Sequence, residues 1–180
     1  EMSRGLGDVY KRQFLVLNQD ECLRHATKST HIMQGYLSLD LSRTVRIRKT
    51  DTKAILTIKG KPNSSGDTRF EWEKEVSVEE ATQLFDLCLG QTIEKTRHLV
   101  LFQSHCFEVD VFSGNHKGLI IAEIELQSAD ENPVPFSYLT DKIKVQQIKC
   151  GITRTTNKTH IIIEENLKKS GDNISSADIR

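Results

Sequence analysis

The chain has 180 residues, about the length of one domain, and its 25 Lys and Arg balance 25 Asp and Glu. A chain without net charge is not expected to bind nucleic acid through bulk charge. It has no apolar run near the ~18 residues of a membrane span, and no secretion signal. We therefore expect a cytoplasmic protein with no nucleic-acid and no membrane partner.

The first thirteen residues, EMSRGLGDVYKRQ, show no periodic hydrophobic pattern and begin with Glu instead of Met. We expect residues 1–13 to be a non-native or disordered extension. The folded domain is expected over residues 14–154. The polar residues 155–180 are expected to form a disordered tail.

From Phe14 onward, short segments with alternating apolar and polar residues predict β-strands. These segments comprise residues 14–18, 31–39, 44–50, 53–60, 69–77, 91–102, 106–114, 118–128 and, more weakly, 142–149. Ser77 and Glu80 have capping-box spacing, and the apolar residues after them recur at helical spacing until Gly90, which predicts one helix. Many strands with one inserted helix predict an antiparallel α+β fold.

Nearly every predicted strand has one apolar face and one face with paired charges, since side chains two residues apart point the same way. The charged positions are Arg46, Arg48, Lys59, Arg69, Lys95 and Arg97, and Glu71, Glu73, Glu108, Asp110, Glu123 and Glu125. An open sheet with one face in water is consistent with this alternation. If the sheet closes, the charged faces line a tunnel.

A face that carries clusters of both charges suits a metal–phosphate site. Arg and Lys bind compact polyanions because guanidinium groups match phosphate oxygens. Clustered carboxylates hold Mg²⁺ or Mn²⁺, which prefer oxygen ligands and bridge to substrate phosphates.

Eight strand segments, in this order, resemble those of the CYTH or triphosphate tunnel metalloenzyme superfamily. This superfamily includes thiamine triphosphatases, inorganic triphosphatases and class IV adenylate cyclases. The segments are FLV (14–16), QGYLS (34–38), TVRIR (44–48), ILTIKG (55–60), RFEWEKEV (69–76), EKTRH (94–98), FEVDVFSG (107–114) and GLIIAEIEL (118–126). The resemblance implies an eight-stranded antiparallel closed β-barrel, the triphosphate tunnel, with flanking helices.

The resemblance also implies roles for the charged residues. Six of them would bind the triphosphate of a small-molecule substrate: Arg46, Arg48, Lys59, Arg69, Lys95 and Arg97. A divalent metal, Mg²⁺ or Mn²⁺, would be held by Asp110, Glu123 and Glu125. Three supporting acids would orient the basic residues or contribute to a second metal site: Glu71, Glu73 and Glu108. The implied activity is metal-dependent hydrolysis of inorganic tripolyphosphate or an organic triphosphate.

Two features depart from the family pattern. The family has an E-x-E-x-K motif directly before its FLV segment, whereas those positions here are Val9, Lys11 and Gln13. The family's last strand has no counterpart in KIKVQQIKCGITR (142–154). The lost motif is expected to lower turnover and not to change the fold.

Other functions stay open. One is cyclisation of ATP, as in class IV adenylate cyclases. Another is a non-catalytic polyphosphate- or nucleotide-binding module, which the missing E-x-E-x-K motif favours. An RNA-binding β-barrel is disfavoured because the charged faces lack interleaved aromatic residues. The sequence also leaves open whether the chain forms a homodimer.

Overall fold

The computed structural model describes residues 10–40, 42–62, 69–102, 105–126, 128, 145–155 and 158–165. The strands are β1 (Tyr10–Val16), β2 (Ala26–Ser38), β3 (Arg43–Lys49), β4 (Ala54–Pro62), β5 (Arg69–Val76), β6 (Ile93–Phe102), β7 (His105–Phe112), β8 (Ile120–Leu126), β9 (Val145–Thr155) and β10 (Lys158–Glu165). The helices are α1 (Gln19–Leu23), α2 (Val78–Asp86) and a 3₁₀ turn, η1 (Gly114–His116). None of the helices in these ranges is long and apolar enough to cross a membrane.

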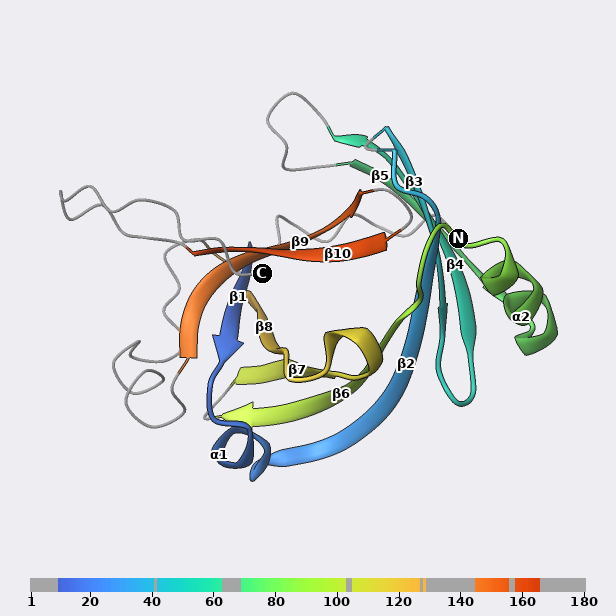
Figure 1. Ribbon diagram of the computed structural model, residues 1–180. Helices are drawn as coiled ribbons and strands as arrows, with labels where there is room; N and C mark the ends of the chain where they lie inside the picture. The colour runs from blue at the N-terminus through green and yellow to red at the C-terminus, as the bar shows by residue number, and fades with distance from the viewer. Residues whose placement is uncertain are drawn as a thin grey trace, which may run out of the picture.

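The strands form one antiparallel sheet in the order β10-β9-β1-β8-β7-β6-β2-β3-β4-β5. Figure 1 shows that this sheet is strongly curved, with α1 and α2 on its outer side. The predicted antiparallel α+β fold is therefore confirmed. The eight predicted strand segments form β1 to β8, and among the described residues the sheet has two further strands, β9 and β10.

Closure of the sheet into a barrel is not observed. Strand β9 pairs with β1 on one side and β10 on the other, so these last strands extend the sheet beyond β1. In the described part of the chain, no ladder joins β10 to β5, which end the strand order. The predicted closed barrel is therefore not confirmed: over the described residues the sheet is open and curved.

The described strands reach beyond the predicted limits of the folded domain. Strand β1 starts at Tyr10, so the fold begins earlier than the predicted residue 14. Strand β10 lies inside the segment for which we predicted a disordered tail. Both strands form because they pair along an existing strand, which short-range hydrophobic patterns do not reveal. Residues 1–9 and 166–180, and the predicted start of the last strand at 142–144, lie outside the described residues.

Apolar side chains of β1, β3, β4, β6, β7 and β8 pack on the outer side of the sheet with those of α1 and α2. Helix α2 begins with the predicted capping box, in which the side chains of Ser77 and Glu80 each accept a hydrogen bond from the other's backbone N–H. Its buried Ala81 packs with Ile47 of β3 and Ala54 of β4. A second core cluster includes Cys22 of α1 together with residues of β1, β6, β7 and β8. Burying these apolar faces leaves the charged faces free to meet on the other side.

Candidate functional site

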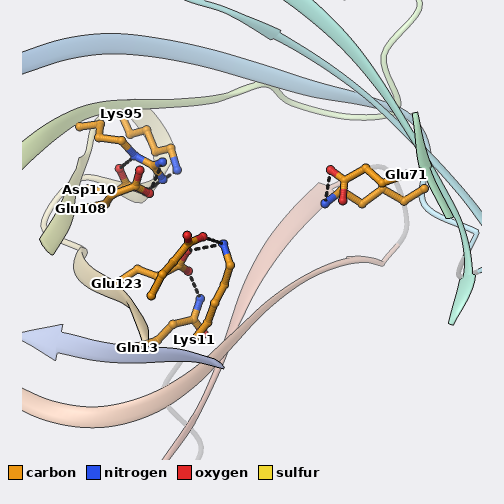
Figure 2. Close-up of polar contacts among 10 residues, drawn as sticks. Lys11, Gln13, Glu71, Lys95, Glu108, Asp110 and Glu123 are labelled. Atoms are coloured by element: carbon orange, nitrogen blue, oxygen red, sulfur yellow. Dashed lines mark hydrogen bonds and ion pairs between the residues drawn. The ribbon is translucent and has the colours of Figure 1, made fainter. Parts of the chain in front are cut away.

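The strand register brings the predicted charged residues onto one face of the curved sheet. Directly opposed residues on antiparallel strands share a face. The opposed pairs include Arg97 and Asp110, Glu108 and Glu123, Gln13 and Glu123, Lys11 and Glu125, Arg46 and Thr57, Thr57 and Glu73, and Lys59 and Glu71. Figure 2 shows that the side chains from β1, β7 and β8 and that of Glu71 point toward a shared central space. The charged surface predicted from alternation is therefore formed, and we call it the charged face.

The most buried part of the charged face is an ion cluster around Asp110. This residue is 7% exposed, and Lys95, which donates to its Oδ2, is 6% exposed. Arg97 binds the same carboxylate with two bonds, from Nε to Oδ1 at 2.7 Å and from Nη2 to Oδ2 at 2.8 Å. Arg97 also donates through Nη1 to Glu108. Asp110 thus holds two basic residues in fixed positions (Figure 2).

The charge of Asp110 depends on these partners. Burial alone would raise the pKa of its carboxyl group, but hydrogen bonds and charge from Arg97 and Lys95 hold the pKa below the ordinary 3.8. A lowered folded-state pKa stabilises the fold above the unfolded-state value, and this stability is lost as the pH falls through the folded-state pKa.

We therefore predict that the free energy of unfolding decreases as the pH is lowered from about 5 through the acid range. Urea unfolding at a series of pH values measures this decrease. In an Asp110→Asn variant, the decrease should be smaller because one titrating group has been removed. If both proteins show the same pH dependence, the lowered pKa of Asp110 does not contribute to the stability of the fold.

A second cluster lies on β1 and β8. The Lys11 Nζ lies 3.1 Å from Oε1 of Glu123 and 2.7 Å from Oε1 of Glu125. Gln13 donates from Nε2 to the other oxygen of Glu123 at 2.8 Å. Burial alone would lower the pKa of the Lys11 ammonium, but the hydrogen bonds and charges of Glu125 and Glu123 outweigh this effect and raise the pKa above 10.5. The ammonium therefore stays charged between two carboxylates.

The basic residues of β3 have fewer partners. Arg46 donates from Nη2 to Thr57 at 3.3 Å and lies 3.9 Å from Glu73. The Nε atoms of both Arg46 and Arg48 are buried and have no hydrogen-bond partner within the described residues. No ion pair joins Arg48 to a carboxylate in that part of the chain, and burial, with Arg46 and Arg97 nearby, lowers its pKa. A cation taken out of water with no close counter-ion is costly, and Arg46 has only a long ion pair, so this pair of half-buried guanidinium groups is suited to bind an anion.

The β4–β5 end of the charged face holds one further pair. Lys59 Nζ lies 2.9 Å from Oε1 of Glu71, a contact drawn in Figure 2. Arg69 is exposed at the start of β5, where the β4–β5 register shifts between Lys59 and Pro62. Among the described residues, no ion pair joins Arg69 to the charged face. Arg69 shares the strand face of Glu71 and helps to lower the pKa of that carboxyl group, so it lies at the exposed end of the charged face.

Two polar residues of the charged face were missed by the sequence analysis. Thr57 is fully buried, accepts from Arg46 and donates to Glu73 at 2.8 Å. Gln34 is opposite Arg48 in the β2–β3 register, and its Oε1 is buried without a hydrogen-bond partner in the described ranges. Both residues are uncharged, so they do not belong to the pattern of paired charges that predicted the site. The alternation along β4 places Thr57 on the same face as Lys59, and this pattern could have identified Thr57 from the sequence.

The three predicted metal ligands do not lie together as a ligand set. Asp110 is bound by Lys95 and Arg97, whereas Glu123 and Glu125 are bound by Lys11. Among the described residues, no group of three or more Asp, Glu, His or Cys side chains could hold a metal ion. As they lie, these residues do not fit the Mg²⁺ or Mn²⁺ that the resemblance implies.

The described residues thus form a curved antiparallel sheet with paired acidic and basic side chains on one face, and two relatives identify the family that this architecture belongs to. The chain is 38% identical over 130 residues to the inorganic triphosphatase of Acetivibrio thermocellus, covering 72% of this chain and 80% of that protein. It is 32% identical over 122 residues to the inorganic triphosphatase of Nitrosomonas europaea, covering 67% and 77%. The chain therefore belongs to the CYTH or triphosphate tunnel superfamily.

A solved structure of an inorganic triphosphatase supports the same assignment. It matches with a TM-score of 0.51 at 26% sequence identity, over 73% of this chain and 85% of the other. The predicted family resemblance is thereby confirmed.

A second similarity concerns the C-terminal part of the chain. Residues 114–179 match the model of the family "Glucose inhibited division protein A". The chain is also 45% identical over 56 residues to the tRNA uridine 5-carboxymethylaminomethyl modification enzyme MnmG of Alkaliphilus oremlandii, over 31% of this chain and 9% of that enzyme. Coverage this small does not assign the chain to that family. Residues 142–154, where we found no counterpart of the last CYTH strand, lie within the family-model match.

Proposed function

We propose that the protein binds inorganic tripolyphosphate on its charged face and hydrolyses a terminal phosphoanhydride bond. The observation that carries this proposal is the pair of half-buried arginines, Arg46 and Arg48, whose buried Nε atoms have no hydrogen-bond partner in the described part of the chain. Two relatives with the name inorganic triphosphatase support the choice of substrate.

In this proposal, Arg46 and Arg48 bind phosphate oxygens, and the basic residues on either side of them extend the site. Lys59 lies toward β5, and Arg97 lies across β2 on β6. Glu71 and Glu108 hold these two cations by ion pairs and so orient them toward the substrate. Fixed cations stabilise the charge that develops on the transferred phosphoryl group, and they need little reorganisation during reaction.

The metal has no step in this proposal, because the carboxylates predicted to hold it are engaged by Lys and Arg side chains. The basic residues alone neutralise the bound triphosphate. Dependence of the reaction on Mg²⁺ or Mn²⁺ stays a prediction from the family resemblance.

A non-catalytic polyphosphate-binding module is the second candidate. It is favoured by one observation: Lys11 and Gln13 occupy the positions of the family's first-strand acidic motif and bind Glu123. Such a module would use the same arginines to bind the anion but would not break the phosphoanhydride bond.

Tripolyphosphate titration of the full chain tests both candidates. We expect the ligand to raise the melting temperature, since a ligand at one hundred times its Kd adds about 2.7 kcal/mol to the free energy of unfolding. We also expect release of orthophosphate and pyrophosphate, measured by ion chromatography with and without added Mg²⁺ or Mn²⁺. A thermal shift without product release would identify the binding module. Neither a shift nor a product would show that the charged face does not bind triphosphate.

A further inference from the structure

A lysine ammonium is placed between two of the carboxylates that the family resemblance assigns to the metal. Lys11 contacts one oxygen of Glu123 and one of Glu125, on the strand paired with its own. Gln13 binds the second oxygen of Glu123. Figure 2 shows Lys11 and Gln13 converging on Glu123 from β1. Two residues of one strand thus hold both oxygens of Glu123 and one of Glu125.

Electrostatics explains why a cation is needed here. Glu123 and Glu125 share a face of β8, and Glu108 is opposite Glu123 on β7. Like charges at such spacing repel unless a cation lies among them. The Lys11 ammonium supplies that positive charge from within the chain. The Lys11 side chain is 53% exposed, so Lys11 can be substituted without leaving a cavity in the core.

We propose that the Lys11 ammonium is the resident cation of the Glu123 and Glu125 carboxylates, and that it excludes a divalent metal ion from them. A metal ion needs the oxygens that Lys11 and Gln13 now bind, and it would lie within a few ångströms of the ammonium. It would therefore bind only after displacing the side chain or against its repulsion.

Mn²⁺ binding to the full chain, followed by the electron paramagnetic resonance signal of free Mn²⁺, tests this proposal. No phosphate is present, so the result does not depend on the proposed function. We expect Lys11→Met to bind Mn²⁺ at least about tenfold more tightly than the unsubstituted protein, since a repelling charge is removed and the carboxylates stay. Lys11→Gln should show the same gain, and it provides a second variant if Lys11→Met does not fold by circular dichroism.

Three controls locate the effect. Lys11→Arg keeps the positive charge and should bind Mn²⁺ as weakly as the unsubstituted protein. Lys74→Met removes the same charge from the exposed, opposite face of β5 and should change nothing. Adding Glu123→Gln to Lys11→Met should abolish the gain. The proposal is overturned if the unsubstituted protein binds Mn²⁺ as tightly as Lys11→Met, or if the double variant keeps the gain.

Discussion

Replacing Arg48 with Ala is expected to weaken tripolyphosphate binding by about ten- to a hundredfold. Arg48 is in the charged face with a buried Nε that has no partner among the described residues, so its guanidinium is available to an anion. Charge-assisted hydrogen bonds contribute about 1.5–3 kcal/mol each, and one such group carries roughly this loss. Isothermal titration calorimetry with tripolyphosphate measures the change in affinity.

Stability separates this role from a structural one. Because Arg48 is half-buried and forms no ion pair in the described part of the chain, Arg48→Ala should unfold at the same or a higher temperature without ligand. The tripolyphosphate-induced thermal shift should be lost at the same time. A variant that is less stable and keeps its ligand response would show that Arg48 serves the fold.

Two variants of β3 provide matched comparisons for Arg48→Ala. Arg48→Lys keeps the charge but loses the planar guanidinium. Its affinity for tripolyphosphate should therefore lie between that of the unsubstituted protein and that of Arg48→Ala. Arg43→Ala removes an exposed arginine on the opposite face of the same strand, where it pairs with Asp40. If Arg43→Ala weakens tripolyphosphate binding as much as Arg48→Ala does, the anion responds to the overall charge of the protein and is not bound specifically at the charged face.

Replacing Asp110 with Asn is expected to lower the free energy of unfolding by about 3–5 kcal/mol, the usual cost of breaking a buried ion pair. The substitution keeps the shape of the side chain but removes the charge that compensates Lys95 and Arg97. Lys95 is 6% exposed and has little access to water, so its charge would remain buried without compensation. Urea unfolding at neutral pH, followed by circular dichroism, measures the loss.

A double variant shows whether the loss comes from uncompensated charge. Adding Lys95→Met to Asp110→Asn removes one of the two cations that lost their carboxylate partner. Part of the lost free energy of unfolding should therefore return. Glu75→Gln, on the exposed edge strand β5, removes the same charge and should change the free energy of unfolding by no more than about 0.5 kcal/mol. If Asp110→Asn falls within that range too, the cluster does not stabilise the fold.

The sequence by itself determined strands β1 to β8, the capped helix and which charged residues share a strand face. These features are local: a period of two assigns neighbouring residues to opposite faces, and Ser77 and Glu80 are close enough along the chain to cap α2. Arg46 and Arg48, and Lys95 and Arg97, were thus recognised as basic pairs on single strands. The uncharged Thr57 was missed because the criterion was charge and not burial.

Tertiary structure alone decided which charges meet and where the sheet ends. Lys11 binds Glu123 across 112 positions of sequence, and the register of β1 on β8 makes this contact. The same long-range pairing decides that Asp110 is surrounded by cations while Arg48 is left without a carboxylate partner in the described residues. It also adds β10 to the edge of β9 instead of closing the sheet. Alternation along one strand carries no information on its partner or register, because those depend on how all the strands pack together.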